Sequence, residues 1–158
     1  MKLTFLFLAA LLVGAASSSD AQTMSYGTPI TADTAKKVAA PAIAEARKNQ
    51  WMMAIAIVDT SGELVYFERM DDTQVGSVDV AISKARSAAR FKRPTKAFQD
   101  ALAAGGEGLR ILALDGAIPV EGGMPLVAGG KIVGAIGASG GTSQQDGVVA
   151  QAAVNALK

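Results

Sequence analysis

The stretch MMAIAIVDTSGELVYFERM, residues 52–70, decides the fold of this 158-residue chain. Its first part, 52–58, is a nearly unbroken apolar run, which is typical of a strand buried on both faces. The residues Asp-Thr-Ser-Gly at 59–62 are those of a tight turn, and 63–70 resumes with valine and two aromatic side chains. The stretch therefore predicts an antiparallel hairpin.

Helical patterns lie on both sides of this hairpin. Apolar residues recur at the spacing of one helical face over 31–48 and again over 76–91. A further helical segment is expected from 94 to about 103, after a break at Arg93-Pro94, and a last helix opens at Ser143. The small apolar residues on these faces permit close helix contacts, so we expect a homo-oligomer of at least two subunits.

A second hairpin is predicted where 124–128 and 131–138 flank Gly129-Gly130. The glycine-rich connection before it, 105–123, holds one short apolar segment, 109–114, which we expect to add a strand. Hairpins separated by helices predict an α+β domain with helices on a largely antiparallel sheet.

The composition excludes several classes of chemistry. The chain has no cysteine and no histidine, so zinc sites of the common kinds, iron-sulfur clusters, cysteine nucleophiles and the usual serine triad are all ruled out. Fifteen basic residues against 14 acidic ones give a net charge of +1, which argues against a nucleic-acid partner.

The first 21 residues have the pattern of a signal peptide. Lys2 is followed by an apolar run at 3–16, and small residues stand at Ser19 and Ala21. We expect cleavage after Ala21, which leaves 22–158 as a single exported domain in the periplasm or outside the cell, without an integral membrane segment. The alternative is an uncleaved anchor.

The first candidate site is a basic stretch in the second helical region. It has no acidic residue and contains Lys84, Arg86, Arg90, Lys92, Arg93 and Lys96. Arginine side chains bind carboxylates and phosphates in bidentate fashion, so Lys84, Arg86 and Arg93 are predicted to receive an anionic small molecule. The alternative is a solvated helix face.

The second candidate site is Glu-Gly-Gly-Met-Pro-Leu at 121–126. Gly122 and Gly123, with Pro125, would let the backbone approach a ligand closely. Close packing of the chain against a helix explains the same glycines.

The third candidate is the start of the last helix, where Ser143 and Asp146 have the spacing of a capping box. Asp146 also shares a helix face with apolar residues, so it would point inward and need a partner such as Lys84 or Arg86. Both interpretations stay open from the sequence.

Taken together, the motifs resemble those of the GlcG/HbpS-like family of haem-binding or haem-degrading domains, which is related to the C-terminal domain of some corrinoid adenosyltransferases. The resemblance covers the mature chain and rests on seven motifs in the same order: Val58-Asp59-x-x-Gly62, Arg69-Met70-Asp71, Gly76-Ser77 followed by Ala81-x-x-Lys84-Ala85-Arg86, Arg93-Pro94-Thr95, Gly122-Gly123-Met124-Pro125-Leu126, Val133 to Gly140, and Gln145-Asp146. It implies a profilin-like, three-layer α/β/α fold around a five-stranded antiparallel sheet. It also implies homo-oligomers and, in exported members, binding of haem.

The chain departs from family members that hold haem iron through histidine. Without histidine, the side chains that remain as possible ligands to haem iron are a hydroxyl, lysine, tyrosine or methionine. Tyr66 and Met70 are preferred because they lie on the same hairpin strand beside Arg69. The other tyrosine and methionine candidates are Tyr26, Met52, Met53 and Met124. Packing in the core is the alternative role for all of them.

Three functions follow as hypotheses. The first is an exported, oligomeric haem-binding protein connected with haem degradation or with iron and redox stress. The second is a small-molecule enzyme in which Lys84 and Asp146 form an acid-base pair near Ser139. The third is an interaction module without a ligand.

Overall fold

The computed structural model describes residues 24–157, so the expected signal segment and its cleavage site lie outside the described residues. Along the chain the elements are α1 (Ala32–Lys48), β1 (Ala54–Val58), β2 (Leu64–Arg69), α2 (Ser77–Phe91), α3 (Thr95–Ala103), the 3₁₀ helix η1 (Gly106–Ala113), β3 (Gly123–Ala128), β4 (Lys131–Ser139) and α4 (Ser143–Ala156).

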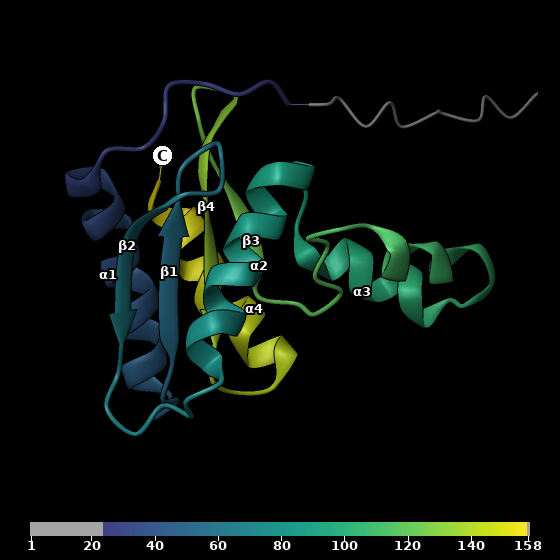
Figure 1. Ribbon diagram of the computed structural model, residues 1–158. Coiled ribbons are helices and arrows are strands. Elements are labelled where there is room, and N and C mark those ends of the chain that lie inside the picture. The colour runs from purple at the N-terminus through teal and green to yellow at the C-terminus, as the bar shows by residue number, and fades with distance from the viewer. Residues whose placement is uncertain (1–23, 158) are drawn as a thin grey trace, which may run out of the picture.

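The four strands form one antiparallel sheet in the order β2-β1-β4-β3. Figure 1 shows α2 in front of this sheet and α1 and α4 behind it. Both predicted hairpins are present, β1 with β2 and β3 with β4. The fold is therefore α+β, with helices on both faces of an antiparallel sheet.

The expectation of five strands is wrong for the residues that the structure describes. The segment 109–114 lies in and directly after η1, and together with α3 it forms an arm that projects from the sheet (Figure 1). Gly105 and Gly106 have φ angles of +69° and +54°, and turn-type hydrogen bonds run from Gly105 N to Leu102 O and from Gly108 N to Gly105 O. These turns lead into η1, where the segment is bonded to itself and ends with Leu114 N donating to Ile111 O, so it needs no strand partner.

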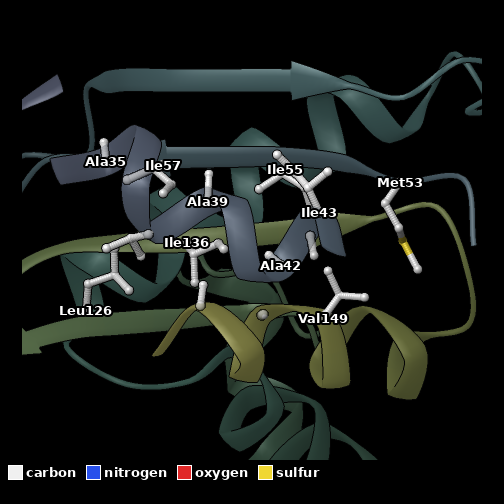
Figure 2. Close-up of a cluster of buried hydrophobic side chains, with 14 of the residues drawn as sticks. Ala35, Ala39, Ala42, Ile43, Met53, Ile55, Ile57, Leu126, Ile136 and Val149 are labelled. Carbon is white, nitrogen blue, oxygen red and sulfur yellow. The ribbon is translucent and has the colours of Figure 1, made fainter. Parts of the chain in front are cut away.

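The larger core lies between the sheet and the pair α1 and α4 (Figure 2). Strand β1 contributes Ile55 and Ile57, and β4 contributes Ile136, all fully buried. The inward face of α1 matches the predicted one: Ala35, Val38, Ala39, Ala42, Ile43 and Ala46. The helical spacing in the sequence thus identified this layer correctly.

The opposite face of the sheet carries a thinner core made of small residues. Its buried members are Ala54, Ala56, Val58, Ala81, Ala85, Ala88, Ala89 and Ala135. A Cβ added to Gly137 of β4 would overlap the carbonyl oxygen of Ala81 in α2. The small helix residues on which we based close helix contacts therefore serve packing within one chain, where they let α2 lie close to β4.

The segment 25–30, ahead of α1, is tied to the beginning of β4. Gly27 N donates to Ile132 O, Ile132 N donates to Ser25 O, and Ile30 N donates to Val133 O. The lead segment therefore occupies a flank of β4 that β1 does not reach, because β1 pairs with β4 only from Ala135 onward.

We predict that Gly137→Ala lowers the free energy of unfolding by about 1–3 kcal/mol, because the new methyl group forces α2 away from β4. The matched control is Gly76→Ala, since a Cβ at Gly76 meets no atom within 4 Å. Urea denaturation followed by circular dichroism measures both variants. A loss at Gly137 no larger than that at Gly76 would contradict the close packing of α2.

Candidate functional site

A buried ion pair joins the two helix layers. Lys84 Nζ lies 2.6 Å from Asp146 Oδ2, and the two side chains are 1% and 4% exposed. The ammonium also donates to Ala138 O at 3.2 Å, while Asp146 Oδ1 accepts from Gly141 N at 3.1 Å. One pair of side chains therefore connects α2, the end of β4 and the first turn of α4.

The inward position of Asp146 follows from how α4 begins. Thr142 is the N-cap: its hydroxyl accepts from Gln145 N, and the Gln145 side chain accepts from Thr142 N. The capping box that we assigned to Ser143 and Asp146 is therefore wrong by one residue. Because the cap is complete without Asp146, its carboxylate is available to Lys84, as the alternative interpretation expected.

Burial dominates the electrostatics of this pair. It raises the pKa of the Asp146 carboxyl above its ordinary value, although the Lys84 ammonium and the amides of Gly141 and Gly140 act in the opposite direction. A carboxylate at this position is costly and depends on Lys84 for compensation. Neither group is accessible to a substrate in the described conformation.

Ser139 lies apart from the ion pair. Its hydroxyl is buried and contacts the hydroxyl of Ser77 at 3.2 Å, and Ser77 also accepts from the Gln74 amide. Ser77 precedes Lys84 by seven residues, which is about two helical turns. The hydroxyl of Ser139 thus bonds to the first turn of α2, while its neighbour Ala138 accepts from Lys84.

The basic stretch makes structural contacts. Arg86 Nε donates to Gly62 O and Arg90 Nε donates to Ser61 O, so these two arginines hold the turn between β1 and β2. Arg93 Nε donates to Phe91 O. Lys92 lies over the Tyr26 ring and Lys96 pairs with Asp100. The described contacts do not bring Lys84, Arg86 and Arg93 to a common site.

The glycines at the start of β3 serve close packing. Gly123 N donates to Thr95 Oγ1 at 2.9 Å, and a Cβ on Gly123 would overlap the carbonyl oxygen of Lys84. A Cβ on Gly122 would lie 3.0 Å from Lys84 Nζ. Pro125 is buried and pairs with Ala135 of β4. Gly122, Gly123 and Pro125 therefore lie against the ion pair and the sheet, which supports their packing role.

Two adjacent hollows open beside β2, away from the turn that joins β1 and β2. The main hollow has a volume of about 500 Å³ and is lined by Arg47, Met52, Glu68, Arg69, Met70, Asp71 and Asp72. The side hollow has a volume of about 270 Å³ and is lined by Lys36, Ala40, Ile43, Ala44, Arg47, Tyr66 and Glu68. Arg47 and Glu68 belong to both and form an ion pair at 3.5 Å, so this pair separates the two hollows.

Of the predicted site residues, Met70 lines the main hollow and Tyr66 lines the side hollow. No pattern in the sequence assigned Arg47 or Glu68 to a site. The register ends at Ala54 and Arg69, and Met70 N donates to Met53 O just beyond it, so the two strand ends lie together at the main hollow. No comparable signal indicated Arg47, which reaches the hairpin from the last turn of α1.

Two findings concern residues 24–157 as a whole. Within them no three aspartate or glutamate side chains gather as metal ligands would. Over the same residues, every helix is too short or too polar to cross a membrane.

A family model described as "haem degrading protein HbpS-like" matches residues 30–155. The chain belongs to the HbpS-like family. Protein GlcG of Escherichia coli K12 is 37% identical over 95 residues, which cover 60% of this chain and 69% of GlcG.

Two solved structures resemble this HbpS-like chain over most of their length. The crystal structure of the PduOC:heme complex has a TM-score of 0.74 at 26% identity and covers 83% of this chain and 96% of its own. The crystal structure of a double mutant of Streptomyces reticuli HbpS has a TM-score of 0.76 at 28% identity, and the match covers 96% of this chain and 99% of that one. The resemblance to the GlcG/HbpS-like family, including its relation to PduO, is thereby confirmed.

We predict that Asp146→Asn lowers the free energy of unfolding by about 3 kcal/mol or more, because it leaves the Lys84 ammonium buried without a counter-charge. Thr142→Ala is the control for simple capping and should cost about 1 kcal/mol. Urea denaturation gives both values. Equal small losses for the two variants would mean that Asp146 contributes no more than a cap.

Proposed function

We propose that this protein is an exported, homo-oligomeric haem-binding protein and that the main hollow is where it takes the ligand. The observation that carries the proposal is the lining of this hollow, which combines two thioethers, Met52 and Met70, with two guanidinium groups, Arg47 and Arg69. The family membership and the PduOC:heme relative support haem as the ligand.

Five of the seven residues that line the main hollow are charged, so the hollow suits the carboxylates of haem better than its apolar ring. A volume of about 500 Å³ is within the usual range for a small-molecule site. Methionine sulfur is an axial ligand of haem iron in other proteins, so the absence of histidine from the sequence leaves a suitable donor type. Guanidinium groups are suited to the carboxylates of haem.

The charges around the main hollow affect how strongly an anionic ligand binds. Glu68, Asp71 and Asp72 line the main hollow together with the two arginines and repel an anionic ligand. Arg69 is held in place because its Nη2 donates to Thr73 O at 2.8 Å. Binding therefore depends on short-range contacts from Arg47 and Arg69 and not on a long-range positive field.

The enzyme hypothesis receives less support from the geometry. It needs a substrate to reach Lys84 and Asp146, whose side chains are 1% and 4% exposed.

The proposal of export rests on the signal-peptide pattern of residues 1–21. The hypothesis of an interaction module without a ligand is separated from haem binding by titration.

We predict a saturable change of the Soret absorbance when hemin is added to micromolar mature protein, starting at residue 22. The expected stoichiometry is one hemin for each chain, since each chain has one main hollow. Hemin added to buffer alone gives the background for aggregation. A linear, non-saturating response equal to that background would remove haem binding and favour the interaction module.

The arm formed by α3 and η1 is where we propose that subunits meet. It presents large apolar side chains to solvent, Leu109 at 55%, Leu112 at 69% and Leu114 at 44% exposure. Figure 1 shows that the arm projects away from the sheet. Exposed apolar side chains gathered in this way are typical of interaction surfaces, and a second copy of the chain is the occupant that the family resemblance implies.

We predict that static light scattering of the mature protein at about 10 µM gives the mass of a dimer or larger assembly. Leu112→Glu should lower this mass, because it places a charge in the apolar contact. Val148→Glu is the matched control, since Val148 is 49% exposed on α4, away from the arm. A monomer mass for the unchanged protein would refute the assembly, and a lower mass for Val148→Glu alone would move the contact to α4.

A further inference from the structure

We propose that β2 pairs with the β2 strand of a second copy of this chain, so that the two sheets join edge to edge into one antiparallel sheet. This contact is separate from the one proposed for the arm, and it does not depend on haem.

The two edges of the sheet differ. β3 carries Pro125, and proline lacks the N–H group that a further strand would bond. β2 has no proline and contains Val65, Tyr66 and Phe67, which are residue types that favour strands. It lies at one side of the sheet, and within residues 24–157 no strand lies beyond it (Figure 1). β2 is therefore the edge that is open to another strand.

The register of the hairpin shows which main-chain groups of β2 are unused. Met70 N donates to Met53 O at 3.0 Å, and bonded and non-bonded partners alternate along an antiparallel pair. Counting back from Met70, every second residue of β2 bonds to β1, so the N–H and C=O groups of Arg69 and Phe67 point away from β1. Unpaired main-chain groups of this kind bond readily to an added strand.

The side chains of β2 favour one register for a second copy. In a two-fold pairing centred on Phe67, this residue lies opposite its own copy, and Glu68 lies opposite the partner's Tyr66, which places a carboxylate beside a hydroxyl in both halves of the contact. A pairing centred on Glu68 or on Arg69 would place like charges opposite each other. A pairing centred on Tyr66 would bring Phe67 to Val65, where β2 bulges. The strand is thus complementary to itself at Phe67.

The layers on both faces of the sheet leave room for the second copy. Phe67 is only partly buried against the alanine layer, so packing against its copy buries more of the ring. On the other face, the residues of α1 that share the side hollow with Tyr66 include Ala40 and Ala44, which are small and exposed. Small side chains allow the two copies of α1 to approach closely across the joined edge.

A single cysteine tests the pairing, because the chain has none of its own. Opposite residues of a bonded antiparallel pair have Cα atoms about 5.5 Å apart, which is within the range of a disulfide. Phe67→Cys should therefore give a covalent dimer under mild oxidation, seen on a non-reducing gel and reversed by a thiol. Leu64→Cys is the matched control: Leu64 is 45% exposed on the same strand. In this register it would lie about 20 Å from its copy.

Light scattering separates this contact from that of the arm. Leu112→Glu, which disrupts the arm contact, should leave a dimer joined through β2, and the further change Phe67→Lys should give a monomer. Circular dichroism confirms that both variants are folded. A Leu112→Glu protein that is already a monomer at about 10 µM would overturn the pairing of β2 and leave the arm contact intact.

Hydrogen exchange tests the pairing in the unchanged protein. The amides of Phe67 and Arg69 should be protected at high protein concentration and should exchange faster on dilution, whereas the Glu68 amide, which bonds to β1, should stay protected. Edge amides that exchange fast at every concentration would overturn the inference, as would equal crosslinking of Phe67→Cys and Leu64→Cys. Protection at every concentration without a covalent dimer of Phe67→Cys would mean that another segment covers the edge, and would also overturn it.

Discussion

The buried pair of Lys84 and Asp146 is the interaction on which the rest of the structure depends. It connects α2 on one face of the sheet with α4 on the other, around the end of β4. Such a pair adds little stability over apolar residues of the same size, but breaking it leaves a buried charge, which is strongly unfavourable. The pair therefore fixes how the first turn of α4 lies relative to α2, while the Thr142 cap sets where the helix begins.

The glycines and alanines around this pair follow from the same constraint. Lys84 can reach Asp146 only if α2 lies close to β4 and if Gly122 leaves room beside the ammonium. The thin layer of alanine beneath α2 provides that closeness. In the sequence Gly122 and Gly123 resemble part of a ligand-binding loop. In the structure they leave the space in which the Lys84 side chain passes the end of the sheet.

Much of the fold could be predicted from the sequence because local patterns determine it. The apolar run before Asp59 and the periodicity of α1 need no knowledge of distant residues. Local chemistry also misled where two signals compete: Thr142 and Ser143 are both suitable caps, and the apolar segment 109–114 resembles a strand until the turns made by Gly105 and Gly106 are considered. The candidate site was harder, since Arg86 and Arg90 bind the carbonyl groups of a turn more than 20 residues away. Tyr66 and Met70 stay predicted site residues; they line the hollows because they lie on the hairpin, whereas Arg47 reaches them only through the packing of α1.

The lead segment 25–30 has a consequence for when the chain can fold. Its partners, Ile132 and Val133, are near the other end of the sequence, and the hydroxyl of Tyr26 donates to Ala89 O, 63 residues away. The central strand β4 is also made late, although β1 requires it. During synthesis the first half of the chain therefore has no sheet to join, and it remains without its native partners until β4 has been made. A chain with this order of contacts therefore completes its sheet only once β4 has been made, so the first half of the chain stays open to other partners for most of its synthesis.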